Sequence, residues 1–182
     1  MTRVFLSLGS NLGDRLELLQ KAVGLLTATE GVRLLDASRL YETEPWESVP
    51  GQTVQRAGWF LNCVVAIETT LSPAALLKRV HQIENALGRV RLGGSPEATR
   101  YEPRTLDMDI LLYGEQVISA PDDLHIPHLL MHERGFVLKP LADLEPELEH
   151  PVLYRTVREL LLELEDEHQV MPAEHPRRWF EP

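Results

Sequence analysis

The sequence predicts an α+β fold in one compact domain. Short apolar segments of strand length occur beside longer segments whose apolar residues recur at helical spacing, and turn residues separate the two kinds. The chain has 182 residues, of which 43% are hydrophobic, and this is enough to bury one core without a second domain. We expect the domain to span residues 1–167 and a C-terminal tail, weakly ordered, to occupy residues 168–182. Within this tail, Trp179-Phe180 fits either a contact with the body of the domain or no contact at all.

The first predicted strand, residues 4–8, leads through a glycine-bearing turn into a helix. The turn ends in helix-capping side chains, and apolar residues then share one helical face at Leu16, Leu19, Val23 and Leu26. A turn of this kind can bind phosphate at the helix N-terminus. Here it lacks both G-x-G-x-x-G and the lysine of a P-loop, so the sequence favours a plain tight turn.

Two further strands are predicted on either side of a loop. Residues 32–41 lead into a segment with Thr43, Pro45 and Trp46, which fits either an aromatic ligand wall with a hydroxyl group or an exposed surface turn. Residues 60–67 are nearly all apolar, as in a central strand covered on both faces. Asn62 interrupts this run, and a buried amide must find polar partners, either a backbone edge or a ligand.

A second helix is predicted after Ser72, which is a good N-cap followed by proline, and Gly88 ends it. The next loop, residues 89–104, concentrates arginine in a chain that is poor in lysine, at Arg89, Arg91, Arg100 and Arg104. A solvated basic loop fits this pattern. So does a phosphate site, because arginine contacts phosphate in a bidentate manner.

Residues 104–113 contain two aspartates inside an apolar run that reads as a strand. Alternation places Leu106, Met108, Ile110 and Leu112 on one face, and puts Asp107 and Asp109 on the other. Two strand residues advance the chain by about 6.6 Å, so both carboxylates can reach one cation. An edge strand with a solvated acidic face is the plain alternative. After Gly114 we expect a turn into a hairpin strand at residues 117–118.

Three histidines follow, at His125, His128 and His132. Zinc is disfavoured because Pro127 prevents a shared helical face and cysteine ligands are missing, so His128 fits better as a phosphate donor or an ordinary loop residue. An apolar helix is predicted after Phe136, and a short helix over residues 156–163.

The composition excludes several classes of function. The formal net charge of −10 repels nucleic acid and anionic membrane, so an anionic substrate must meet a local basic patch. Cys63 is the only cysteine, and no apolar run approaches membrane-spanning length. We expect a cytoplasmic monomer that binds a small anion, with no nucleic-acid or membrane partner.

Taken together, eight short motifs resemble the 6-hydroxymethyl-7,8-dihydropterin pyrophosphokinase family. They span residues 4–148 in order, and jointly they are specific: Leu8-Gly9-Ser10-Asn11-Leu12-Gly13, Tyr41-x-Thr43-x-Pro45, Phe60-Leu61-Asn62, Ile83-Glu84, Gly88-Arg89-Val90-Arg91, Pro103-Arg104-Thr105-Leu106-Asp107-x-Asp109, Ile126-Pro127-His128 and Arg134-Gly135-Phe136. The resemblance implies a ferredoxin-like sandwich with a largely antiparallel sheet and helices on its faces. It also implies transfer of pyrophosphate from ATP to the pterin alcohol.

The resemblance implies roles for individual residues. Asp107 and Asp109 correspond to the ligands of two Mg2+ ions that bind with ATP. Together with Arg89 and Arg104, they correspond to the catalytic residues. ATP-binding positions correspond to Glu84, Arg89, Arg91, Arg100, Arg104, Ile110, His128 and Arg134. Pterin-binding positions correspond to Thr43, Pro45, Trp46, Phe60, Asn62, Asp107 and Phe136, with the two phenylalanines as the rings that sandwich the pterin. Tyr101-Glu102 and Trp46-Glu47-Ser48 depart from the family pattern.

Two other functions use some of the same residues. A magnesium-dependent nucleotidyl- or phosphotransferase with another acceptor would need the aspartates and arginines, but would have no use for Phe60, Asn62 and Phe136. A non-catalytic nucleotide-binding or RNA-binding module is disfavoured by the acidic balance.

Overall fold

The computed structural model describes residues 1–46, 58–88, 105–120 and 124–181. The helices and strands in these residues are, in chain order, β1 (Thr2–Ser10), α1 (Arg15–Thr27), β2 (Val32–Ala37), β3 (Tyr41–Thr43), β4 (Phe60–Thr69), α2 (Pro73–Ala86), β5 (Asp107–Tyr113), β6 (Ile118–Ala120), β7 (Leu124–Ile126), the 3-10 helix η2 (Met131–Glu133), α3 (Gly135–Leu144), α4 (Val157–Leu162) and β8 (Val170–Pro172). No helix among these residues is long and apolar enough to cross a membrane.

The described strands form one six-stranded sheet and one two-stranded sheet. The larger sheet has the order β5-β1-β4-β3-β8, with β2 also pairing with β4, and all its pairs are antiparallel. The strand predicted over residues 32–41 is therefore two strands on the same partner. Between them, the Ser38 hydroxyl, rather than a backbone carbonyl, accepts the N–H of Val64 at 2.9 Å.

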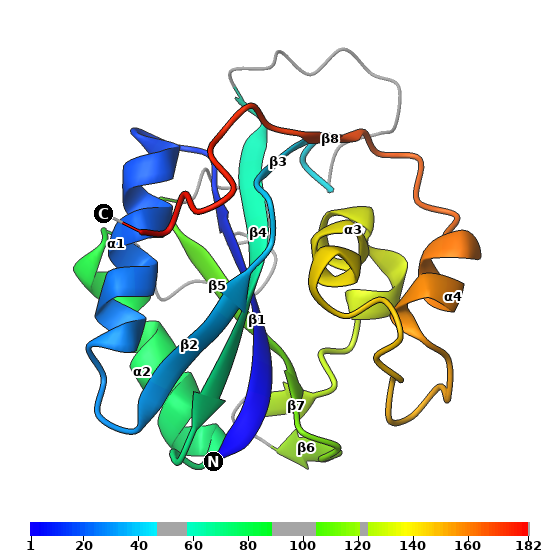
Figure 1. The fold of residues 1–182 in the computed structure, drawn as a ribbon, viewed down its shortest axis with the longest axis horizontal. Coiled ribbons are helices and arrows are strands. Elements are labelled where there is room, and N and C mark those ends of the chain that lie inside the picture. Colours follow the sequence, from blue (N-terminus) through cyan, green and yellow to red (C-terminus); the bar gives the residue numbers. More distant parts are fainter. Residues whose placement is uncertain (47–57, 89–104, 121–123, 182) are drawn as a thin grey trace.

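Helices cover both faces of the large sheet. Figure 1 shows α1 and α2 on one side and α3 and α4 on the other. The central strand β4 divides its residues between the two cores: Cys63, Val65 and Ile67 face α1 and α2, while Val64 and Ala66 face α3 and α4. This confirms the predicted α+β arrangement and the central position of residues 60–67.

Local signals at the helix ends explain where the helices begin. The side chain of Asp14 accepts the N–H of Glu17 at 3.0 Å before α1, and Ser72 caps α2 with proline at the first helical position. Thr156 and Glu159 form a reciprocal capping box at α4. These caps lie where the sequence predicted helix starts.

The structure corrects the predicted faces of the aspartate strand. Leu6 pairs with Ile110 while Phe5 pairs with Leu112, so Leu111 is an extra residue in β5. This bulge shifts the alternation by one residue. Met108 and Ile110 pack with α1 and α2 as expected, but Leu112 packs on the opposite face with α3 and α4.

Two other predictions were wrong. The strand after Gly114, β6, pairs with β7 rather than with the aspartate strand. The segment after His168 is ordered, because β8 pairs with β3 and Trp179 is buried with 2% of its surface exposed. The indole N–H of Trp179 donates to the Ser38 carbonyl at 2.9 Å, which fixes this segment to the body of the domain.

Candidate active site

Four residues form a row across the sheet at the start of β5. Asp107 is opposite Gly9 on β1, Gly9 is opposite Asn62 on β4, and Asn62 is opposite Tyr41 on β3. Directly opposite residues of antiparallel strands point to the same face. Asp107 and Asn62 therefore share the face that carries α3 and α4, with only Gly9 between them.

Gly9 makes room for the amide of Asn62. A Cβ atom at Gly9 would lie 2.2 Å from Oδ1 of Asn62, closer than two such atoms can approach. The absence of a side chain lets the Asn62 amide lie over β1, toward the strand that carries Asp107. Sequence reasoning did not assign this role to Gly9, although a glycine inside a strand signals close approach by another group.

Asn62 finds its partner on the neighbouring strand. Its Nδ2 donates to Oγ1 of Thr43 at 2.6 Å, and both side chains are buried. Phe60 is opposite Thr43 in the same strand pair, and its ring lies 3.7 Å from the position that a Gly9 Cβ would take. The structure thus brings together three of the predicted pterin residues, Thr43, Phe60 and Asn62.

The two aspartates lie half-buried on the same face of β5. In the described part of the sheet, β5 is an outer strand, and its Met108 and Ile110 side chains pack in the core that α1 and α2 cover. The fully buried carboxylate of Glu84 accepts the N–H of Met108 at 2.9 Å. Because Met108 lies between Asp107 and Asp109, this bond fixes the backbone that carries both carboxylates.

His128 lies against the same strand. Its N–H donates to the carbonyl of Leu111, the bulge residue, at 2.9 Å, and its Nδ1 accepts the N–H of Leu130 at 3.2 Å. Burial lowers the pKa of His128 to about 4, the charge of Arg134 acts in the same direction, and Asp107 opposes it. The neutral ring accepts at Nδ1, so Nε2 carries the proton and can donate a hydrogen bond.

Arg134 lies between two aromatic rings. Its guanidinium carbon is 4.7 Å from the centre of the Trp46 ring and 5.6 Å from that of Phe136. The structure therefore brings Trp46 next to the start of α3, together with two other predicted site residues.

The remaining predicted residues divide into two groups. Pro45 is half-buried just before Trp46, and the side chain of Ile110 packs in the core beneath α1 and α2. The four predicted phosphate-binding arginines, Arg89, Arg91, Arg100 and Arg104, lie outside the described residues.

Comparison with known proteins supplies the family. The sequence model described as 7,8-dihydro-6-hydroxymethylpterin-pyrophosphokinase (HPPK) matches residues 5–146. The chain belongs to the HPPK family. It is 45% identical over 166 residues to a 2-amino-4-hydroxy-6-hydroxymethyldihydropteridine pyrophosphokinase of Methylorubrum extorquens, a match covering 91% of this chain and 95% of that relative. A Bacillus subtilis protein of the same name is 41% identical, covering 80% and 79%.

The chain also matches part of longer proteins. Folic acid synthesis protein fol1 of Schizosaccharomyces pombe is 42% identical over 161 residues, but the match covers only 20% of its length. Among solved structures, Plasmodium falciparum HPPK-DHPS with pteroate matches with a TM-score of 0.66 at 18% identity, covering 89% of this chain and 42% of that one. An HPPK-DHPS crystal structure in complex with substrates matches with a TM-score of 0.63 at 15% identity, covering 89% and 43%. These structural matches support the HPPK fold described above.

Proposed function

We propose that this HPPK protein transfers the pyrophosphoryl group of ATP to the hydroxymethyl oxygen of 6-hydroxymethyl-7,8-dihydropterin, a step in tetrahydrofolate biosynthesis. The observation that carries the proposal is the row in which Asp107 and Asn62 share one face of the sheet across Gly9. In this row, an amide suited to a heterocycle lies near a carboxylate suited to a cation, which supports the proposal. The family relationship supports the same reaction.

The pterin binds at Asn62 and Thr43 in this proposal. A pterin edge resembles a guanine edge and presents paired donors and acceptors, which an amide and a hydroxyl group can match. The bond from Asn62 to Thr43, at 2.6 Å, holds both side chains in fixed orientations before the ligand arrives. Phe60 and Phe136 enclose the ring system, and Pro45, Trp46 and Asp107 complete this part of the site.

The donor set on β5 fits Mg2+. Carboxylate oxygens are the ligands that this cation prefers, and Asp107 and Asp109 present two of them on one face. Within the described residues, no group of three or more His, Cys, Asp or Glu side chains is placed to hold a metal ion. We infer that Asp107 and Asp109 would hold the two Mg2+ ions that bind with ATP. Bound there, they would offset negative charge on the phosphates.

The protein contributes mainly binding and orientation to this reaction. The hydroxymethyl oxygen forms a bond to the β-phosphorus of ATP, the bond from that phosphorus to the α-phosphate oxygen breaks, AMP leaves, and the hydroxyl proton is released. Neutral His128 donates from Nε2 to a phosphate oxygen, and Arg134 adds positive charge nearby. Arg89, Arg91, Arg100 and Arg104, which lie outside the described residues, bind the remaining phosphate charge in this proposal.

Two of the residues predicted to bind ATP have side chains that are buried in the domain. The Glu84 carboxylate is fully buried against the backbone of Met108, and the Ile110 side chain packs in the core. In this proposal, Glu84 contributes to ATP binding by holding β5 in place, and Ile110 contributes through its backbone.

The decisive assay combines purified protein, ATP, MgCl2 and 6-hydroxymethyl-7,8-dihydropterin. We expect AMP and the pterin diphosphate to form in equal amounts, and no AMP to form when either Mg2+ or the pterin is omitted. Turnover of ATP without the pterin would favour a transferase with another acceptor. No turnover at any Mg2+ concentration would favour a nucleotide-binding protein without catalysis. Size-exclusion chromatography of the same sample tests the proposed monomer.

A further inference from the structure

A segment near the C-terminus connects two parts of the candidate site. Residues 166–172 lie outside the stretch that the HPPK sequence model matches, which ends at residue 146. They run from the start of α3, where Phe136 and Arg134 lie, to the edge of β3, which ends at Thr43. The proposed pterin site has one wall on each of these elements.

Asp166 is the contact to α3. The residue at the N-cap of α3, Arg134, makes no side-chain capping bond, and the Asp166 Oδ2 atom instead accepts the N–H of Gly135 at 2.8 Å. A carboxylate at a helix N-terminus is favoured by the exposed N–H groups and by the helix dipole. The fit is close, because a Cβ at Gly135 would lie 3.2 Å from that same oxygen.

The other carboxylate oxygen of Asp166 organises its own segment. Oδ1 accepts the backbone N–H of His168 at 3.0 Å and lies 2.5 Å from Nδ1 of its ring. Only 3% of the Asp166 side chain is exposed. Burial alone would raise the pKa of Asp166, but the hydrogen bonds from Gly135 and His168 outweigh it and lower the pKa. Asp166 is therefore a buried, charged hydrogen-bond acceptor.

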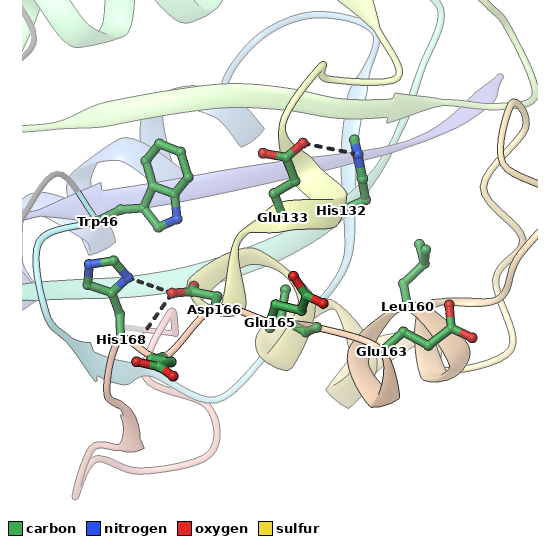
Figure 2. A pocket seen from close by; sticks show the side chains of 10 residues that line it. Trp46, His132, Glu133, Leu160, Glu163, Glu165, Asp166 and His168 are labelled. Atoms are coloured by element: carbon green, nitrogen blue, oxygen red, sulfur yellow. Dashed lines mark hydrogen bonds and ion pairs between the residues drawn. The ribbon is translucent and has the colours of Figure 1, made fainter. Parts of the chain in front are cut away.

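The same segment is tied to β3 immediately beyond His168. Gln169 and Glu44 exchange two bonds: the Glu44 N–H donates to the Gln169 carbonyl at 3.0 Å, and the Gln169 N–H donates to Oε2 of Glu44 at 2.9 Å. Val170 then pairs with Thr43 in the antiparallel ladder. Asp166, His168 and Trp46 line a hollow of about 670 Å³ together with residues of η2 and α4. Figure 2 shows these three side chains at one end of it.

We propose that residues 166–172 set the spacing of the two pterin-site walls, with Asp166 as the positioning residue. Asp166 fixes the start of α3 and hence Phe136, while Gln169 and Val170 fix β3 and hence Thr43. Asp166 touches no substrate in this proposal, which rests on the proposed pterin site. Loss of the Asp166 carboxylate therefore weakens pterin binding more than it weakens ATP binding or slows the chemical step.

The test compares Asp166→Asn with Glu167→Gln. Glu167 is an exposed carboxylate lining the same hollow, so its variant controls for the loss of one nearby negative charge. Asp166→Asn should raise the KM for the dihydropterin by about five- to tenfold, because an amide must turn a donor toward one of the N–H groups that the carboxylate accepted. The KM for ATP should change by less than about twofold, and Glu167→Gln should behave as wild type.

A merely structural role would give a different pattern. It would lower the melting temperature and the active fraction while leaving both KM values unchanged, and that result would overturn the proposal. Equal rises in both KM values would also overturn it.

A second measurement on the wild-type protein decides the matter even where the variant does not fold. Dihydropterin alone should slow amide hydrogen exchange at Gly135 and Gln169, because a ligand that needs the walls in place must in turn stabilise them. Unchanged exchange at both amides under saturating pterin would contradict the proposal. Wild-type turnover of the dihydropterin is the separate check on the proposed function.

Discussion

The two faces of the large sheet differ in the side chains that the same strands present on them. On the face toward α1 and α2, apolar side chains continue to the end of the strands, and Leu6, Leu8 and Met108 are buried. On the other face, α3 and α4 cover an apolar core around Phe5 and Val64, and polar side chains occupy the sheet beyond it. Asp107, Asp109, Asn62 and Thr43 belong to this polar region.

This difference shows how one strand can serve stability and function at once. In β5, Met108 packs into the core while Asp107 and Asp109 on either side face the site. Glu84 holds the Met108 backbone, so packing beneath the strand fixes the carboxylates above it. Substitutions on the two faces should therefore separate activity from stability.

The largest expected effect is on the site face. Asp109→Asn should lower kcat/KM by about a thousandfold, equivalent to about 4 kcal/mol, because it weakens the hold on a divalent cation rather than one hydrogen bond. The free energy of unfolding should change little, since Asp109 is half-buried at the margin of the core. Steady-state kinetics and urea unfolding on the same preparation measure both quantities. An Asp109→Asn protein with wild-type kinetics across Mg2+ concentrations would remove Asp109 from the metal site.

A smaller effect of the opposite kind is expected on the core face. Leu6 is fully buried beneath α1 and α2, where it pairs with Val65 and Ile110. Leu6→Ala should lower the free energy of unfolding by about 3 kcal/mol through lost burial and a residual cavity. The folded variant should keep a kcat within about threefold of wild type, measured well below its melting temperature. A large loss of kcat in fully folded Leu6→Ala would show that the faces are not separable.

Much of the fold could be predicted because its signals are local. The caps at Asp14, Ser72 and Thr156, the glycine after α2 and the apolar run of β4 all lie beside the elements that they define. The family resemblance, carried by short motifs in order, was confirmed together with the α+β class.

The wrong predictions concern pairings between distant residues. The bulge at Leu111 is set by the register between β5 and β1, and no local pattern in residues 104–113 marks it. The C-terminal segment is polar and rich in proline, but its order comes from β3, from Ser38 and from the start of α3. Trp179 and Ser38 are more than a hundred residues apart in the sequence. Composition alone does not reveal such a contact, and it therefore suggested a loose tail.

The site was predictable in part for the same reason. The residue types at Asp107, Asp109 and Asn62 were conspicuous because polar side chains inside apolar strands need an explanation. Their alignment across Gly9 required the strand registers. The positioning contact of Asp166 gave no signal, because an acidic stretch such as residues 163–167 reads as a solvated surface.

The smallest expected effect tests how far solvent is excluded from the His128 ring on the face that carries α3 and α4. Burial lowers the pKa of His128 from its ordinary 6.5 to about 4, so the unfolded chain binds a proton more readily than the folded protein between these values. Stability should be unaffected above pH 6.5 and should fall as the pH drops from 6.5 toward 4. His128→Gln removes this proton uptake. Between pH 7 and pH 5, wild type should therefore lose about 1 kcal/mol more free energy of unfolding than the variant, allowing for partial solvent access.

The comparison of wild type with His128→Gln separates the effect of His128 from that of another histidine whose pKa is also lowered. Burial also lowers the pKa of His150, with the neighbouring His132 adding to the effect, but His150 is present in both proteins and its contribution cancels in the difference. Parallel pH profiles of unfolding for wild type and His128→Gln would mean that solvent reaches the ring freely. The neutral donor assigned to His128 would then have to be a cation at mildly acidic pH, and ATP binding would strengthen as the pH falls from 7 to 6 rather than stay constant.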